Sequence, residues 1–208
     1  MSDERLTALA LAAGAGDRGA LEEFIRGTQH DVWRFVAHLT DVQSADDLTQ
    51  ETFLRALGSL PRFAGRSPAR VWLLSIARRA VVDRLRHTAA RPAICRTDDW
   101  QHAAEQSRAR HDVDPGEEIV VAHMLRHLSR ERREAFVLTQ LLGLSYDEAA
   151  RTAACPVGTI RSRVARARTD LIALWRHTEE ESRIGRGRPI RPAAQHTAAP
   201  PRVAAAGV

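Results

Sequence analysis

Apolar residues recur at helical spacing along two stretches of the chain, residues 6–87 and 118–177. In the first stretch, Gly14 and Gly16 indicate a break between helices. The segment 63–69, FAGRSPA, has the Gly and Pro of a turn. No segment alternates polar and apolar residues as a strand would. The pattern therefore predicts an all-α protein with two small helical domains.

Two helices of the first domain can be delimited from their ends. Ser44, followed three residues later by Asp47, is a capping pattern that predicts the start of the helix SADDLTQETFLRALGSL, and Pro61 closes it. The segment 70–87, RVWLLSIARRAVVDRLRH, predicts one long helix. Its predicted buried stripe consists of Leu74, Ala77, Val81 and Leu85.

Between the two domains, and again after the second, the apolar period is lost. Residues 88–117 contain Pro92, Pro115, Gly116 and scattered charges, which predict a flexible linker. Residues 178–208 are mostly aperiodic and rich in Pro, Ala and Arg, which predicts a disordered tail.

The second domain contains a pattern typical of helix, turn, helix. Gly143 suits the end of one helix, and Ser145 with Glu148 forms a capping box that starts a short helix. Pro156 suits the first turn of the next helix. The small residues Ala149, Ala150, Ala153 and Ala154 would let the two helices cross closely.

The helix after Pro156 has two contrasting faces. Ile160, Val164, Ala167 and Leu171 share one side, while Ser162, Arg166 and Thr169 point the opposite way, flanked by Arg161, Arg163 and Arg168. A recognition helix needs one stripe for its domain and another that offers Arg to phosphates and guanines. An exposed, solvated helix usually mixes Glu with Arg, but no acid occurs over 151–169. The pattern favours DNA binding.

Charge alternates in blocks along the chain. Residues 62–91 carry eight Arg and one acid, and residues 151–208 carry eleven Arg and four acids. By contrast, residues 1–61 carry ten acids and five Arg, and residues 92–118 seven acids and three Arg. Two separate basic blocks indicate two contacts with nucleic acid. All of the 31 basic residues are Arg.

Several function classes are disfavoured. Cys95 and Cys155 stand apart, which argues for a reducing compartment, the cytoplasm, and against a disulfide framework or zinc site. His123 and His127 have the i, i+4 spacing of metal ligands but lack a carboxylate or thiol to join them. No window is apolar enough to span a membrane. With no catalytic set or phosphate loop, we expect a non-enzyme without cofactor or metal.

Three segments in order, DDLTQETFLRAL, LPRFAGRSPARVWLLSIARRAVVDRLRH and LSYDEAARTAACPVGTIRSRVARAR, resemble the extracytoplasmic-function (ECF) group of the bacterial sigma-70 family. The likeness covers about 24–87 and 119–175, and QHDVWRFVAHLTDVQSADDLTQETFLRA is most similar to the actinobacterial sigma-C type. It implies an alternative sigma factor for transcription initiation, with sigma-2 and sigma-4 domains over 6–87 and 118–177. The acidic linker would then occupy the RNA path of the polymerase.

The resemblance implies protein partners as well as promoter DNA. It places a face of one helix against the clamp helices of the largest subunit of core RNA polymerase, and the second domain against the flap of the second largest. The docking residues would be Asp47, Gln50, Glu51 and Leu54, spaced i, i+3, i+4, i+7. A solvated helix side is the plainer interpretation of the same residues. An anti-sigma factor is a further candidate partner.

By the same resemblance, the loop 63–67 would receive a base flipped out of the minus-10 element, which costs a few kcal/mol to unpair. The implied minus-10 residues are Phe63, Gly65, Arg66, Ser67, Trp72, Arg79 and Arg86. Trp72 could stack on an unpaired base or pack beside Ile76, and the sequence leaves both open.

The implied minus-35 residues are Pro156, Gly158, Thr159, Arg161, Ser162, Arg163 and Arg166. Thr152 and Ala154 depart from the family, in which Ile and Gly are common there. Two other classes of protein remain as alternatives: a self-contained helix-turn-helix regulator, and an RNA-binding adaptor that uses the Arg-rich tail. Only a sigma factor needs two DNA modules, a linker and a polymerase-docking face together.

Overall fold

The computed structural model describes residues 1–89 and 115–186. Every regular element within these ranges is a helix, which confirms the all-α prediction. The predictions of a linker over 88–117 and of a tail over 178–208 fall mostly on residues 90–114 and 187–208, which lie outside the described residues. The chain divides into two units, Met1–Leu174 and Trp175–Val208.

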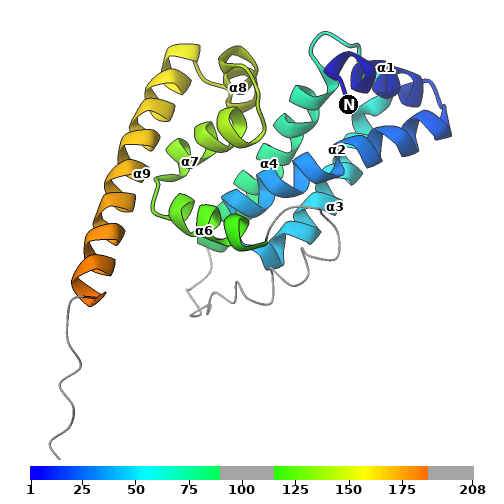
Figure 1. The fold of residues 1–208 in the computed structure, drawn as a ribbon. Coiled ribbons are helices and arrows are strands. Elements are labelled where there is room, and N and C mark those ends of the chain that lie inside the picture. Colours follow the sequence, from blue (N-terminus) through cyan, green and yellow to red (C-terminus); the bar gives the residue numbers. More distant parts are fainter. Residues whose placement is uncertain (90–114, 187–208) are drawn as a thin grey trace, which may run out of the picture. The chain divides into compact units, whose positions relative to one another are not determined.

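The first group of helices, coloured blue to green in Figure 1, packs together around a core. The core consists of large apolar side chains. Phe24, Phe35, Leu73 and Leu74 are each at most 2% exposed. Burying one such side chain stabilises the fold by roughly 1.5–3 kcal/mol. The elements are α1 (Asp3–Gly14), α2 (Arg18–Leu39), α3 (Val42–Ser59), the 3-10 turn η1 (Leu60–Arg62) and α4 (Ala69–Ala89).

The break between the first two helices lies where the glycines predicted it. Helix α1 ends at Gly14, and Gly16 has a φ of +103°, a conformation that glycine adopts without a steric penalty. Asp17 then caps α2, since its Oδ1 accepts a hydrogen bond from the backbone N–H of Ala20 at 3.0 Å.

The predicted start of α3 was wrong. Ser44 lies in the first turn, and the N-cap is Asp41, whose Oδ1 accepts a hydrogen bond from the N–H of Ser44 at 2.8 Å. Asp and Ser are both good capping residues, and Asp41 lies three residues earlier, so it adds a turn to the helix. The Ser44 hydroxyl also donates to the Asp41 carboxylate at 3.0 Å.

Helix α4 is buried on a wider face than the predicted stripe. Leu74, Ala77 and Val81 are at most 1% exposed, as predicted. The side chains of Leu73 and Ile76, and those of Val71 and Ala80, are buried too. The reason lies in the tertiary packing, because α4 contacts α1, α2, α3 and α8. A helix with many neighbours has few positions that face solvent.

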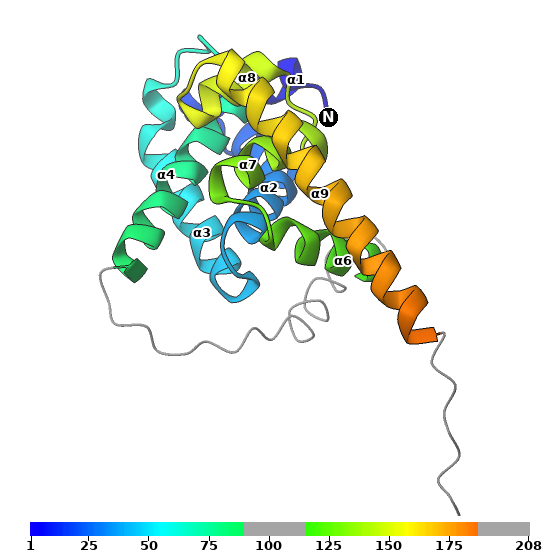
Figure 2. The same cartoon turned by 90° about the vertical axis from the view of Figure 1, so that its left-hand side faces the viewer.

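The second group of helices begins earlier and ends later than the sequence indicated. Pro115 is the first residue of α6, three residues before the expected boundary, as suits a proline at the first helical position. The last helix runs as one element beyond His177 to Arg186 (Figure 2). The elements are α6 (Pro115–Arg126), α7 (Arg130–Phe136), the π-helical turn η2 (Val137–Leu141), α8 (Tyr146–Ala153) and α9 (Val157–Arg186).

One titratable side chain is buried near the end of α2. His38 is only 7% exposed. Burial, followed by the nearby charges of Arg34 and Arg133, lowers the pKa of His38 to about 4. The imidazole is therefore neutral at physiological pH, because its charged form is disfavoured by both desolvation and like charge.

Candidate nucleic-acid interface

The helix-turn-helix is held together by the local contacts that its sequence predicted. Gly143 has a φ of +69° where the π-helical turn ends. Ser145 and Glu148 form the predicted capping box: the Ser145 N–H donates to the Glu148 carboxylate at 2.9 Å, and the Glu148 N–H donates to the Ser145 hydroxyl at 3.3 Å. Burial acts against the charged form of Glu148. The hydrogen bonds from Ser145 and the charges of Arg151 and Arg70 nonetheless hold its pKa below the ordinary value.

The turn between α8 and α9 contains the one left-handed non-glycine residue among the described residues. Ala154 has φ +51° and ψ +50°, and its N–H bonds to the carbonyl of Ala150. The N–H of Cys155 bonds to the same carbonyl at 3.1 Å and closes the end of α8. The resemblance described above implies a glycine at this position, and an alanine there is strained by its Cβ.

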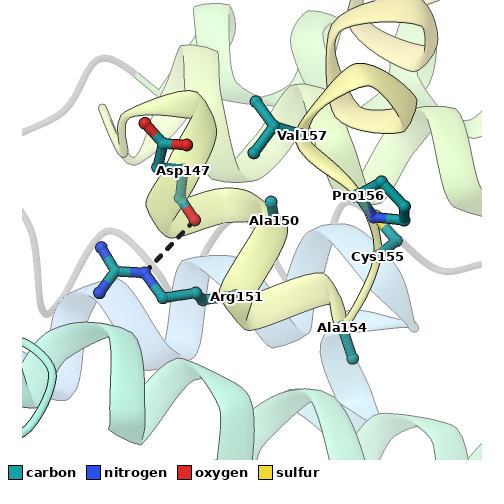
Figure 3. A pocket seen from close by; sticks show the side chains of 7 residues that line it. All are labelled: Asp147, Ala150, Arg151, Ala154, Cys155, Pro156 and Val157. Atoms are coloured by element: carbon teal, nitrogen blue, oxygen red, sulfur yellow. Dashed lines mark hydrogen bonds between the residues drawn. The ribbon is translucent and has the colours of Figure 1, made fainter.

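An open hollow of about 440 Å³ lies beside this turn. Figure 3 shows Asp147, Ala150 and Arg151 on α8, with Pro156 and Val157 on the chain that enters α9. The Arg151 Nε donates to the Asp147 carbonyl at 3.4 Å. Predicted DNA contacts at this end of α9 differ in exposure: Pro156 and Gly158 are exposed, and Thr159 is half-buried.

Helix α9 has the two faces that its sequence predicted. Ile160, Val164 and Ala167 are at most 1% exposed, and Leu171 is half-buried. The opposite side, with Ser162, Arg166 and Thr169, is exposed. One side of this helix is therefore fixed in the domain, and the other is available to a ligand.

Two arginines on the flanks of this face are held by neighbouring helices. The guanidinium carbon of Arg161 lies 6.0 Å from the centre of the Tyr146 ring, within the range of a cation–π contact. Arg168 donates to the Gln140 side chain at 2.6 Å. Both side chains remain exposed, so they could still reach phosphates.

The other two arginines of this face, Arg163 and Arg166, differ in exposure and in their contacts. Arg163 is half-buried, and its Nη1 lies 3.8 Å from the Cys155 sulfur. Arg166 is exposed and makes no hydrogen bond or ion pair within residues 1–89 and 115–186. Ser162 donates only to the Thr159 carbonyl one turn earlier, at 3.0 Å. The pair Ser162 and Arg166 is thus the part of the face that is least engaged with its own domain.

The loop before α4 has an aromatic base and an exposed charge. The rings of Phe63 and Trp72 lie 4.8 Å apart, inclined at 39°, and both residues pack against the core. Gly65 has a φ of +66°, Arg66 is exposed and Ser67 is half-buried. Trp72 therefore has one aromatic neighbour already, while part of its surface stays open.

The arginines of α4 separate into two kinds. Arg70 donates to the Asp31 carboxylate at 2.6 Å and to the Leu142 carbonyl at 2.6 Å, and Arg78 is paired with the buried Glu134. Arg79 and Arg86, the two arginines of α4 among the predicted minus-10 residues, are exposed and take part in no ion pair among the described residues. Their charges are therefore free to meet a polyanion. The sequence did not separate these two kinds, because the partners of Arg70 and Arg78 are distant along the chain.

The predicted docking face of α3 is largely exposed. Asp47 and Gln50 face solvent, and Leu54 is 70% exposed, although it is a large apolar residue. Leu57, one turn further along the helix, is also exposed, and two exposed leucines among polar groups are typical of an interface rim or of ordinary surface.

An arginine that the sequence reasoning missed lies beside this face. Arg55 pairs with Glu51 at 2.5 Å and with Asp83 of α4 at 2.9 Å. The hydrogen bond to Asp83 is the main reason that the pKa of Arg55 is raised, although partial burial opposes the shift. The i, i+4 spacing of Glu51 and Arg55 could have indicated the first pair, but the second joins residues 28 apart.

Other candidate chemistry finds no support. His123 and His127 are exposed and make an edge-to-face ring contact at 5.0 Å. In the described part of the chain, no group of three or more metal-ligating side chains gathers. No helix in that part is both long and apolar enough to cross a membrane.

Comparison with known proteins agrees with this arrangement. Residues 24–91 match the family model "Sigma-70 region 2", and residues 119–171 match "Sigma-70, region 4". The first range contains the loop and α4, and the second contains the helix-turn-helix.

Relatives that cover most of the chain are found among curated and solved proteins. The ECF RNA polymerase sigma factor SigC of Mycobacterium tuberculosis (strain CDC 1551 / Oshkosh) is 56% identical over 171 residues, which cover 82% of this chain and 91% of that protein. The RNA polymerase sigma-H factor of Pseudomonas aeruginosa is 31% identical, covering 74% of this chain and 84% of its own length. The solved structure of CnrH in complex with the cytosolic domain of CnrY superposes with a TM-score of 0.64 at 27% identity, covering 83% of this chain and 98% of CnrH.

These likenesses define a class of initiation factor that confers promoter choice on RNA polymerase and is not itself an enzyme. The chain belongs to the sigma-70 family, within its extracytoplasmic-function group. It is an alternative sigma factor of transcription initiation, as the resemblance of its motifs implied.

Proposed function

We propose that three surfaces of this sigma factor have separate roles in initiation: polymerase binding, minus-10 recognition and minus-35 recognition. The α3 face of Asp47, Gln50, Glu51 and Leu54 docks on the clamp helices of the largest subunit of core polymerase. The loop 63–67 with Trp72, Arg79 and Arg86 captures an unpaired base of the minus-10 element. The exposed face of α9 reads the minus-35 element. The protein acts in the cytoplasm, and its sigma-4 domain meets the flap of the second-largest subunit.

The observation that carries this proposal is the character of α9. Its anchored stripe and its exposed, acid-free face of arginines suit insertion into a major groove. Arg166, which makes no hydrogen bond or ion pair among the described residues, supplies the donor pair that guanine accepts. Ser162, one turn away, is short enough to let the helix approach the base edges.

Base capture by the loop is supported by a second set of observations. Gly65 is in a left-handed conformation, so the chain turns there without a side chain in the way. Arg66 is exposed beside it and offers a charge to the DNA backbone. The Phe63–Trp72 pair provides an aromatic surface, and one stacked base contributes about 1–3 kcal/mol to binding.

A regulatory protein is a further partner that we propose. The relative CnrH was solved in complex with the cytosolic domain of CnrY, and this chain aligns over nearly all of CnrH. A protein of the anti-sigma kind would have to cover the exposed Leu54 or the arginine face of α9 to block polymerase or DNA. Pull-down with the parent protein as bait, compared with baits altered on one face or the other, tests this partner.

The test of the proposed function is promoter opening. Cognate core polymerase with this protein should give run-off transcripts from a subset of a genomic promoter library, and permanganate should modify thymines in the opened region. Arg66→Glu should leave core binding intact and abolish opening of duplex DNA. A template already mismatched across the start region should partly rescue it, because the cost of unpairing, a few kcal/mol, is removed. An Arg66→Glu protein that opens duplex DNA as well as the parent would refute the base-capture assignment.

A further inference from the structure

Helix α1 lies outside the range matched by the region 2 family model, which begins at residue 24. It nevertheless lies beside the loop that leads into α4 (Figure 1). Leu6 and Ala10 anchor it in the core, at 2% and 0% exposure. Thr7, Leu11 and Gly14 are spaced i, i+4, i+7 and therefore share a face, and each of them meets a different point of the segment 60–69.

The first contact fixes the end of that segment. The hydroxyl of Thr7 accepts a hydrogen bond from the backbone N–H of Ala69, the first residue of α4, at 3.0 Å. A helix leaves its first N–H groups without partners, and a capping side chain usually supplies one. Pro68 precedes α4 and has no side-chain acceptor, so α1 supplies the cap from 62 residues away. The Thr7 hydroxyl is itself oriented by donating to the Asp3 carbonyl at 2.8 Å.

The second contact fixes the beginning of the segment. A Cβ placed on Gly14 would lie 2.7 Å from the carbonyl oxygen of Leu60 and 3.8 Å from the Cα of Pro61. These are backbone atoms of η1, which cannot rotate away as the end of a side chain could. Gly14 is therefore where α1 and η1 touch without space for a methyl group.

The third contact lies between these two points, at the turn of the loop. A Cβ on Gly65 would meet the side-chain methyls of Leu11 at 3.4 and 3.6 Å. Leu11 is 44% exposed, which is unusual for a leucine whose neighbours in α1 reach the core. Its exposed part forms an apolar wall beside the one residue of the loop that has no side chain.

We propose that α1 is a positioning element for promoter opening, in which Thr7, Leu11 and Gly14 hold the loop in its base-receiving conformation. The inference rests on the proposed role of the loop in base capture. None of the three residues needs to touch DNA for this role. Loss of one contact lowers the fraction of protein whose loop is correctly placed, and the apparent affinity for the unpaired base falls by the same factor.

The test measures binding of holoenzyme to a single strand. The probe is the non-template strand across the minus-10 element of a promoter that the parent protein opens. Thr7→Val keeps the shape of Thr7 but removes its hydroxyl, and it should weaken binding by up to about fivefold, the full effect of a lost helix cap. Thr7→Ser keeps the hydroxyl and should bind like the parent. Leu11→Ala removes the methyl groups that lie beside Gly65 and should also weaken binding.

A matched control separates positioning from loss of helix stability. Ala8 is exposed on α1, and Ala8→Gly weakens the helix by about as much as the lost cap does. It should bind the probe like the parent, and all variants should retain parental affinity for core polymerase and for minus-35 duplex. If Ala8→Gly weakens binding as much as Thr7→Val, the contact has no special role and the inference is wrong.

Failure of the inference can be told from failure of the proposed function by including Gly65→Val. If Gly65→Val binds weakly while Thr7→Val and Leu11→Ala bind like the parent, the loop captures the base without help from α1. If Gly65→Val itself binds like the parent, the loop is not the capture site, and the role of α1 falls with it. If Thr7→Val and Gly65→Val bind weakly and Thr7→Ser binds normally, the inference stands.

Discussion

Replacing Ala154 by glycine should stabilise the helix-turn-helix, although most substitutions of a turn residue destabilise a protein. Ala154 has φ +51° and ψ +50°, the left-handed conformation in which the Cβ of an L-residue is crowded. Its side chain is exposed, so truncation removes no packing. The turn is thus strained at a position where glycine would not be.

The size of the effect follows from two opposing terms. Relief of the left-handed strain is worth about 1–2 kcal/mol for one residue. The greater conformational freedom of glycine in the unfolded chain lowers the free energy of unfolding by about 0.4–1 kcal/mol. We therefore expect Ala154→Gly to raise the free energy of unfolding by roughly 0.8 kcal/mol, the difference between the midpoints of those two ranges.

Urea unfolding followed by far-ultraviolet circular dichroism measures this change. With a slope of about 2 kcal/mol per molar urea, the midpoint should rise by roughly 0.4 M. Ala165→Gly is the matched control, because Ala165 is also exposed but lies within α9. It should lower the free energy of unfolding by about 0.8–1 kcal/mol.

The two substitutions are chemically identical and differ only in backbone conformation. They should therefore move the midpoint in opposite directions. If Ala154→Gly lowers the midpoint as Ala165→Gly does, Ala154 is not left-handed in solution, and the strain attributed to this turn does not exist.

Three other predictions concern DNA, polymerase and pH. Arg166→Ala should change which upstream base is preferred, by about 1–3 kcal/mol of discrimination, whereas Arg168→Ala should weaken transcription from all promoters alike. Transcription from base-substituted promoters tests both, and if Arg166→Ala lowers transcription from all of them equally, Arg166 contacts only phosphate. Asp47→Arg should lower the affinity for core polymerase in a titration without lowering the unfolding midpoint, and unchanged affinity would remove this residue from the docking face. His38 has a folded pKa of about 4. Its unfolded pKa is about 6.5, so the unfolded chain binds the extra proton between these values and stability falls as pH falls through that window. Between pH 7.5 and pH 5 the loss should be about 2 kcal/mol in urea unfolding, and His38→Gln should remove it; a variant with the same pH dependence as the parent would contradict the assignment.

Features set by neighbours along the chain could be predicted from the sequence. The capping box of Ser145 and Glu148 is local, as is the break at Gly14 and Gly16, and both are present in the structure. The stripe of Ile160, Val164 and Ala167 needs only the period of a helix, and these residues are buried as predicted.

Features set by distant parts of the chain could not be predicted. No local signal tells that Thr7 caps a helix that begins 62 residues later, or that Arg55 reaches Asp83 across 28 residues. The same holds for the arginines of α4, of which Arg78 is paired and Arg79 is not, because the partner of Arg78 is a glutamate of α7. The mistaken cap of α3 has another cause, since Asp41 and Ser44 are similar signals one turn apart and only backbone geometry decides between them.

The chain has no lysine, and no histidine occurs over residues 157–176, so every cation on the exposed face of this part of α9 is a guanidinium. A guanidinium keeps its proton at any pH at which a protein of this kind is folded. The charge of this face is therefore constant. Its affinity for DNA should depend on ionic strength, through release of counterions, and not on pH. Lysine acetylation, by which many DNA-binding surfaces are neutralised, has no target there, so control of this surface falls to molecules that cover it.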